Sequence, residues 1–338
     1  MHTSRLSPAA ARRRPTAGLC YLTVAGILWG TGGLTGSLLY RTVDLAPMAV
    51  ATYRLGIGGA VILAFLAVVG RRWPRHRAAW TRIVVVGLLS ALYQASYFGA
   101  VALTSVSLAT LITIGTAPVL VLAVQAVTGR SRLDRRAVTA SCLALAGLGL
   151  LVGLPADGFA PVAVLSSAGL ALASAAGFAT LTLVGVRPVA GLDELATTGL
   201  GFTVGGLLLA PFAAAGAGLG FTPGLPALAL LVALGTGPTA LAYLLYFRGL
   251  RTVEAGTAAL MALLEPLVGA LLAALLLGDR LGPVGLAGAA LLGAAVVLAA
   301  RVPAAAGVPA AVGVPAEPAG NPAVVPAGPG DASRRRPG

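Results

Sequence analysis

The residue with the clearest chemistry in this sequence is one glutamate in the middle of a long apolar run. Glu265 is followed by Pro266 near the centre of residues 253–281. A run of this length can cross a bilayer, where a carboxylate is costly unless it is paired, protonated or hydrated. The proline also leaves the carbonyl of Ala262, four residues earlier, without its helical partner. Glu265 is therefore predicted to exchange protons or to bind a cationic part of a solute; a structural role beside Pro266 is the alternative.

One arginine lies well inside a predicted span, away from its cytoplasmic end. Arg54 lies a few residues from the outer end of the second span. Two opposite buried charges can offset each other's desolvation, so an ion pair between Arg54 and Glu265 is one hypothesis. The other is that the long side chain of Arg54 reaches the membrane interface.

Two polar stripes repeat 149 positions apart. Each has the spacing i, i+4, i+7 and so occupies one helix face; the residues are Ser90, Gln94 and Tyr97 in the third span, and Thr239, Tyr243 and Tyr246 in the eighth. They are predicted to line a solute pathway with neutral hydrogen-bonding groups, with Trp29 as one wall. Packing or an interfacial position is the alternative for the aromatic side chains.

Two prolines lie at matching places in the two halves. Pro118 precedes Pro266 by 148 positions. Both are predicted to act as hinges that loosen their helices near the membrane midplane, with a static kink as the alternative.

The composition indicates a membrane protein. Hydrophobic residues make up 58%, charged residues 10%, and the mean hydropathy is +0.94, so too few polar residues are present to cover a water-soluble globule. The two cysteines and two histidines form neither a disulfide framework nor a metal cluster. No cofactor is expected, and without a nucleotide-binding loop direct use of ATP is not expected either.

Ten spans are predicted. They lie near 19–39, 46–69, 81–101, 105–127, 137–154, 161–185, 194–215, 224–247, 253–277 and 283–300. Of the 23 arginines, this count puts 20 on one side and two on the other. Because positive residues stay in the cytoplasm, both termini are predicted to be cytoplasmic, in the plasma (inner) membrane. The first span is predicted to be an uncleaved anchor.

The repeat predicts the domain organisation. Five spans per half is an odd number, so the halves enter the membrane in opposite directions. The predicted fold class is an all-α membrane protein of two inverted five-helix repeats. Residues 1–16 are a basic cytoplasmic tail, 17–154 and 161–301 the repeats, and 302–338 a disordered Pro/Ala-rich cytoplasmic tail.

Small residues recur every four positions in several spans. Examples are Gly149 with Gly153, and the series Gly285, Ala289 and Gly293. Such faces let helix backbones approach closely, so they are predicted to be packing faces.

Several motifs resemble those of EamA-type permeases of the drug/metabolite transporter superfamily. They are ILWGTGG, PMAVATYR, SYFGAVALTS, LAYLLYFRGLRTVEAG and LLEPLVGALLAALLLGDRL, within residues 17–301. The resemblance implies ten helices around a central cavity in a carrier for small metabolites. The chain departs from the family pattern at Asp279, where a glutamate is frequent, and at Phe178, where a tryptophan is common.

The predicted function is a secondary transporter that moves a small organic solute by alternating access. The solute would be an amino acid, amine, carboxylate or drug-like compound, and the resemblance favours export. Proton coupling and a homodimer are left open; membrane lipid is an expected partner and nucleic acid is not. The alternatives are a membrane-embedded enzyme acting on lipid or isoprenoid substrates, and a passive channel.

Overall fold

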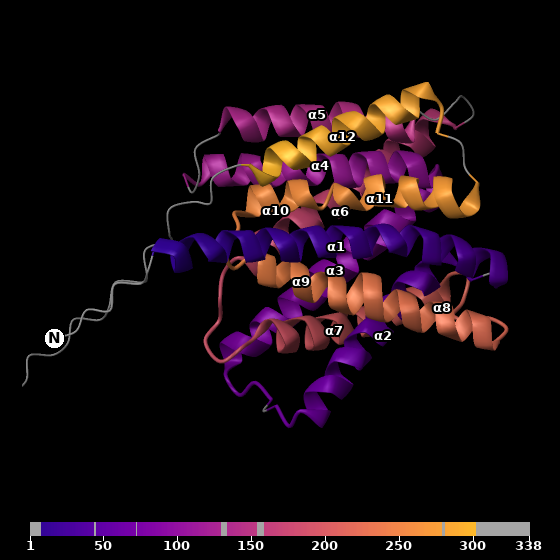
Figure 1. Ribbon diagram of the computed structural model, residues 1–338. Helices are drawn as coiled ribbons and strands as arrows, with labels where there is room; N and C mark the ends of the chain where they lie inside the picture. Colours follow the sequence, from indigo (N-terminus) through magenta and orange to yellow (C-terminus); the bar gives the residue numbers. More distant parts are fainter. Residues whose placement is uncertain are drawn as a thin grey trace, which may run out of the picture. The chain divides into compact units, whose positions relative to one another are not determined.

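The computed structural model describes residues 8–43, 45–71, 73–129, 134–153, 159–278 and 281–301, and Figure 1 shows that these residues are overwhelmingly helical. The first half contains α1 (Pro8–Thr42), α2 (Pro47–Val68), α3 (Arg77–Leu103), α4 (Val106–Val127) and α5 (Arg135–Val152). The second half contains α6 (Pro161–Gly185), α7 (Glu194–Ala215), α8 (Leu225–Gly235), the π-helix η1 (Thr236–Leu241), α9 (Ala242–Gly249), α10 (Ala255–Met261), α11 (Leu264–Leu272), the π-helix η2 (Ala273–Leu277) and α12 (Pro283–Ala300). The predicted tail 302–338, residues 1–7 of the predicted tail 1–16, and Asp279 lie outside the described residues.

These elements make ten spans long and apolar enough to cross a membrane. α8, η1 and α9 form one span, Leu225–Gly249, and α10, α11 and most of η2 form another, Ala255–Leu276. Every span lies within four residues of its predicted bounds. The prediction of an all-α membrane protein with ten spans is confirmed.

Local sequence explains where several helices begin. The side chains of Asp193 and Asp134 accept hydrogen bonds from the backbone nitrogens of Ala196 and Arg136, at 2.7 and 3.3 Å, and so cap α7 and α5. α2, α6 and α12 start instead at a proline, which has no N–H to leave unpaired in the first turn.

Helix contacts follow the repeat. α2 packs along α7, and α5 along α12. α3 packs on α6, and the counterpart of α3 in the second repeat, α8 to α9, packs on α1. In the same way, α4 packs on α6, and its counterpart α11 packs on α1. Exchanging the first five spans with the last five therefore reproduces the contact pattern, as two repeats of inverted topology require.

α5 and α12 approach each other through glycines on both helices. A Cβ added at Gly147 of α5 would lie 2.6 Å from the backbone nitrogen of Leu292, and one at Gly288 of α12 would collide with the backbone nitrogen of Leu151. The predicted packing position Gly149 faces open space instead. Because two residues along a helix turn the side chain by about 200°, the stripe chosen from the sequence lies on the wrong face of α5.

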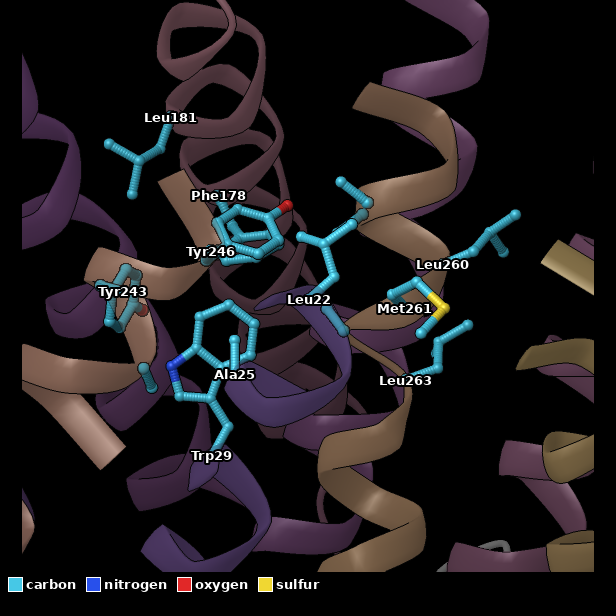
Figure 2. Close-up of a cluster of buried hydrophobic side chains, with 14 of the residues drawn as sticks. Leu22, Ala25, Trp29, Phe178, Leu181, Tyr243, Tyr246, Leu260, Met261 and Leu263 are labelled. Atoms are coloured by element: carbon cyan, nitrogen blue, oxygen red, sulfur yellow. The ribbon is translucent and has the colours of Figure 1, made fainter. Parts of the chain in front are cut away.

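Aromatic rings fill the centre of the main hydrophobic core. The indole ring of Trp29 on α1 lies 5.0 Å from the rings of Tyr243 and Tyr246 on α9 and 5.9 Å from that of Phe178 on α6. Figure 2 shows these side chains pointing toward one another, with Leu22 and Ala25 beside them. The cluster joins the first span of each repeat to the eighth span.

Candidate functional site

A cavity of about 600 Å³ lies between helices of both repeats. Five of the predicted pathway residues line it: Trp29 of α1, Arg54 of α2, Gln94 and Tyr97 of α3, and Glu265 of α11. Sequence reasoning missed Tyr93, which lies one position before Gln94 and three after Ser90, on the side of α3 that the stripe predicts. The rest of the wall is mostly apolar and includes Val50, Phe98 and Ile114.

The other four predicted pathway residues are buried outside the cavity wall. Thr239 is fully buried and contacts Arg54. Tyr243 and Tyr246 pack on Trp29, and the Tyr246 hydroxyl is 2.9 Å from the Thr182 hydroxyl. Ser90 is 2% exposed, beside the close approach of Gly205 on α7. The two stripes therefore have different surroundings, one largely at the cavity and the other in the core.

Glu265 is positioned by an interruption of its span. α10 ends at Met261 and α11 begins at Leu264, so the carboxyl-bearing residue sits in the first turn of a new helix. The carbonyl of Ala262, which was predicted to be freed by Pro266, instead accepts from the Glu265 backbone nitrogen at 3.0 Å. A tighter turn thus replaces the lost bond, and the glutamate is not needed to satisfy that carbonyl.

The close fit of α1 also positions Glu265. A Cβ at Gly30 would lie 3.0 Å from the Glu265 carbonyl oxygen and 2.5 Å from Cβ of Val268. A Cβ at Gly26, one turn earlier, would lie 2.7 Å from Cβ of Leu264. Two glycines therefore allow α11 to lie against α1 beside Trp29.

The two predicted hinges differ. α4 continues as an α-helix through Pro118, whereas the span of Pro266 is interrupted just before it. A further irregularity was not predicted: the π-helix Thr236–Leu241 contains Pro238. Its wider turn lets the Thr239 hydroxyl donate to the carbonyl of Leu234, five residues back, at 2.8 Å.

Arg54 is held by this π-helix. Its Nε donates to Oγ1 of Thr239 at 3.3 Å. The ion pairs found among the described residues are Arg71–Asp193 and Arg251–Glu194, so Arg54 and Glu265 line one cavity without pairing. The hypothesis of a direct Arg54–Glu265 ion pair does not describe this structure.

Two residues of the cavity wall carry buried donors that have no partner among the described residues. These atoms are Nε1 of Trp29 and Nε2 of Gln94, and the two residues are 4% and 1% exposed. Ser90 Oγ is a third such atom in the described part of the chain, and it lies off the wall. Nearly all buried polar groups in proteins are hydrogen-bonded, so these three atoms are exceptions in the core beside the cavity.

The cavity reaches one end of the helices. Its wall extends from Glu265 to Leu45 and the exposed Arg41 at the connection between α1 and α2. The start of α1 lies at the opposite end, where Gly18 approaches Val253 and Thr252. We refer to these as the open end and the closed end.

The closed end contains the repeat-related counterpart of the cavity, reduced to about 20 Å³. Gly185 and Phe247 line this void, and Gly36 and Phe98, 149 positions earlier, line the large cavity. A Cβ at Gly185 would lie 2.9 Å from the ring of Phe247, whereas one at Gly36 would meet nothing within 4 Å. The same glycine–phenylalanine pair is thus in contact at one end and apart at the other.

Polar contacts hold the closed end together. Arg251 Nε lies 2.6 Å from Oε1 of Glu194, and Arg82 donates to the carbonyl of Val184. The positions that correspond in the first repeat are Leu45 for Glu194 and Ala102 for Arg251. This charged contact is therefore specific to one end.

A separate hollow of about 610 Å³ lies beside the closed end. It runs between the end of α2 and the start of α7, includes Arg71, Trp73 and Asp193, and shares only Leu192 with the small void. It does not extend to Trp29, Gln94 or Glu265.

Ten spans in two repeats around a cavity that holds an arginine and a glutamate define a multi-pass membrane transporter built from a duplicated five-helix unit. The chain belongs to the EamA-like transporter family, whose model matches residues 16–153 and 165–301. It is 31% identical over 273 residues to the uncharacterized transporter YwfM of Bacillus subtilis (strain 168), covering 80% of this chain and 90% of that relative. It is 26% identical over 267 residues to the uncharacterized inner membrane transporter YicL of Salmonella typhimurium (strain LT2), covering 77% of this chain and 87% of that relative.

A solved structure shares the fold. It is described only as the crystal structure of a protein, and it aligns with a TM-score of 0.70 at 22% identity, over 84% of this chain and 96% of its own. The family and the names of the relatives point to transport and not to catalysis. In the described residues, no group of three or more His, Cys, Asp or Glu side chains is placed to hold a metal ion.

Proposed function

We propose that the protein is a secondary carrier that moves a small organic solute by alternating access, and that it works as an exporter. The observation that carries this proposal is the pair of repeat-related spaces, one of about 600 Å³ and the other of about 20 Å³. If the two repeats exchange their local conformations, the open end closes and the closed end opens. The solute site would then be reachable from each side in turn.

The predicted orientation assigns the two ends. With 20 of 23 arginines on one side of the spans, the end that holds Arg82, Arg187 and Arg251 would face the cytoplasm. The cavity would then open to the outside of the inner membrane, as expected for an exporter that has released its solute. The name of the Salmonella relative, an inner membrane transporter, supports this membrane.

Glu265 is the proposed coupling residue. It is the acidic side chain on the cavity wall, and its charge is not neutralised by an ion pair with Arg54. A carboxylate in this position can take up a proton in one conformation and lose it in the other, which links solute movement to the proton gradient. Pro266 and the interruption before it would let α11 move relative to α10.

Counterflow in proteoliposomes tests the proposal. Candidate solutes are first chosen by comparing metabolites in cells that lack or overproduce the protein. Vesicles loaded with the best candidate should then accumulate labelled solute from outside, because a carrier exchanges solute across the membrane faster than it returns empty. Flux that is not stimulated by solute on the far side would indicate a passive channel, and conversion of the solute would indicate an enzyme.

A further inference from the structure

The hollow between the end of α2 and the start of α7 has the size and the walls of a ligand site. Its volume of about 610 Å³ falls within the range of about 300–1,000 Å³ that is typical of small-molecule sites. Leu66, Ala196 and Leu200 give it an apolar side, while Arg71 and Asp193 add one positive and one negative charge. The hollow shares no lining residue with the cavity of the proposed pathway, so the carrier function gives it no role.

Local sequence positions both charged residues. Gly70 has a φ of 67°, and after it the backbone nitrogen of Arg71 donates to the carbonyl of Leu66 at 3.0 Å. This glycine turn ends α2 and leaves Arg71 beside the start of α7. There, Oδ1 of Asp193 accepts from the backbone nitrogen of Ala196 at 2.7 Å, which fixes the carboxylate at the first turn of the helix.

The two charges interact only loosely with each other. Nη1 of Arg71 lies 3.5 Å from Oδ2 of Asp193, and the two side chains are 60% and 37% exposed. Exposed ion pairs are weak, so both groups are available to a ligand. A simple anion would meet the carboxylate, and a simple cation would meet the guanidinium. The ligand that suits both therefore carries a negative and a positive group close together.

The hollow lies at the depth of the lipid headgroups. It is formed where the spans Pro47–Val68 and Glu194–Ala215 have their neighbouring ends. Phe65 and Val68 at the end of α2 are 53% and 87% exposed, as expected of side chains that face acyl chains. Trp73 in the wall is 55% exposed, and tryptophan is enriched where a membrane meets water. These surroundings favour a lipid over a water-soluble ligand.

We propose that this hollow binds the headgroup of a phospholipid with a primary ammonium, as in phosphatidylethanolamine. The lipid phosphate accepts hydrogen bonds from Arg71, and the ammonium donates hydrogen bonds to Asp193. Phosphatidylcholine has the same two charges, but its quaternary ammonium has no N–H to donate. Phosphatidylglycerol has no cation at all. The proposal does not rest on the carrier function, because it uses no residue of the cavity wall.

Lipid binding to the purified full-length protein tests the proposal. The three phospholipids, with the same palmitoyl and oleoyl chains, are titrated into delipidated protein in detergent, and bound lipid is counted by native mass spectrometry. We expect the first phosphatidylethanolamine to bind about tenfold more tightly than either other lipid, because only its headgroup forms hydrogen bonds with both charges. Equal affinities, or tighter binding of phosphatidylglycerol, would overturn the proposal.

Variants assign the binding to the hollow. Asp193→Asn keeps a side chain that can cap α7 but removes its charge. It should weaken phosphatidylethanolamine about tenfold, while binding of phosphatidylglycerol, which has no cation to lose, should not fall. Arg71→Gln should weaken phosphatidylethanolamine about tenfold as well, through the phosphate. The matched controls are Asp134→Asn, which changes the cap of α5 in the same way, and Arg75→Gln, an exposed arginine of the same loop outside the hollow.

The variants also define what would refute this site. A preference for phosphatidylethanolamine that survives Asp193→Asn would exclude the ammonium contact, and unchanged binding by Arg71→Gln would exclude the phosphate contact. Equal losses in Asp134→Asn or Arg75→Gln would show that the lipid responds to the charge of this membrane face and not to the hollow.

Discussion

Glu194 at the start of α7 and Arg251 after α9 form an ion pair of 2.6 Å across the closed end of the protein. The first repeat has Leu45 and Ala102 at the corresponding positions. Closing the open end would therefore bring apolar side chains together where the closed end uses opposite charges. The two conformations of the proposed cycle differ in the chemistry that holds them.

Glu194→Gln should favour opening of the closed end. The two side chains are 23% and 28% exposed, so the pair contributes on the order of 1 kcal/mol, which is about a fivefold change in population. In a chain whose two cysteines are replaced, Thr197→Cys in the small void should react faster with a maleimide when Glu194 is changed. Arg71→Gln, which breaks the more exposed pair with Asp193, is the control. An unchanged rate would mean that the ion pair does not hold this end closed.

Gly36→Leu should stop transport without preventing binding. The position faces open space in this conformation, but closure of the open end would bring it against Phe98, as Gly185 meets Phe247 now. We expect solute binding close to that of the wild type and counterflow reduced to background. Gly149→Leu, also in open space but away from the cavity, should keep both. Full counterflow by Gly36→Leu would contradict the exchange of conformations between repeats.

Glu265→Gln should uncouple transport from the proton gradient. The amide has the shape of the protonated carboxyl but cannot release a proton. Solute-for-solute counterflow should persist, while accumulation driven by an imposed pH difference should disappear. Arg54→Gln should instead weaken solute binding and leave any remaining transport responsive to pH. A Glu265→Gln variant that still accumulates solute against its gradient would exclude this residue as the coupling site.

Gly147→Ala should destabilise the protein. The added methyl group would lie 2.6 Å from the backbone nitrogen of Leu292, and overpacking of this kind costs about 1–3 kcal/mol. Gly149→Ala meets nothing within 4 Å and should be neutral or slightly stabilising. Thermal unfolding in detergent measures both. A Tm for Gly147→Ala at or above that of Gly149→Ala would mean that α5 and α12 are not held together here.

Glu254→Gln should change how stability depends on pH. Burial, with a smaller effect of the Asp134 charge, raises the pKa of Glu254 above its ordinary value of 4.5. A carboxyl with a raised pKa holds its proton more tightly in the folded state, so its contribution to stability is greatest at low pH and is lost as pH rises through the raised value. Glu254 is partly exposed, so at neutral pH the glutamine variant should be more stable by less than about 1 kcal/mol, with no gain near pH 4. A gain of equal size at both pH values would exclude this cause.

Apolar periodicity and repeat counting were sufficient for the architecture. The ten spans and the duplication follow from residues spaced 148 or 149 positions apart, because a bilayer imposes nearly the same length on every helix. Glu265 could be identified from the sequence because charged side chains are rare at the centre of a membrane span. Its position on the cavity wall agrees with that reasoning, and its coupling role remains a prediction.

The sequence was less informative about helix faces. Tyr97 and Tyr246 occupy equivalent repeat positions, yet one lines the cavity and the other is buried against Trp29 and Thr182. The repeats adopt different local conformations, and a sequence does not say which repeat has which. With 46 glycines, many small-residue stripes can be drawn, and only the contacts show that α5 uses Gly147. The π-helix around Pro238 was not predicted, and its Thr239 accepts a hydrogen bond from Arg54, 185 positions away in the sequence.

The glycine–phenylalanine pairs at the two ends allow one conformation of the protein to be inferred from the other. The inferred conformation is the one in which the open end is closed. Gly185 with Phe247 shows at atomic detail what Gly36 with Phe98 should become, because the two pairs occupy equivalent positions in two copies of the same domain. The present conformation of each repeat is therefore the expected conformation of the other repeat after the transition. The same substitution can be made at either of the two equivalent positions. If the protein tolerates it at one position and not at the other, the difference identifies the conformation that most molecules adopt, and no ligand needs to be known.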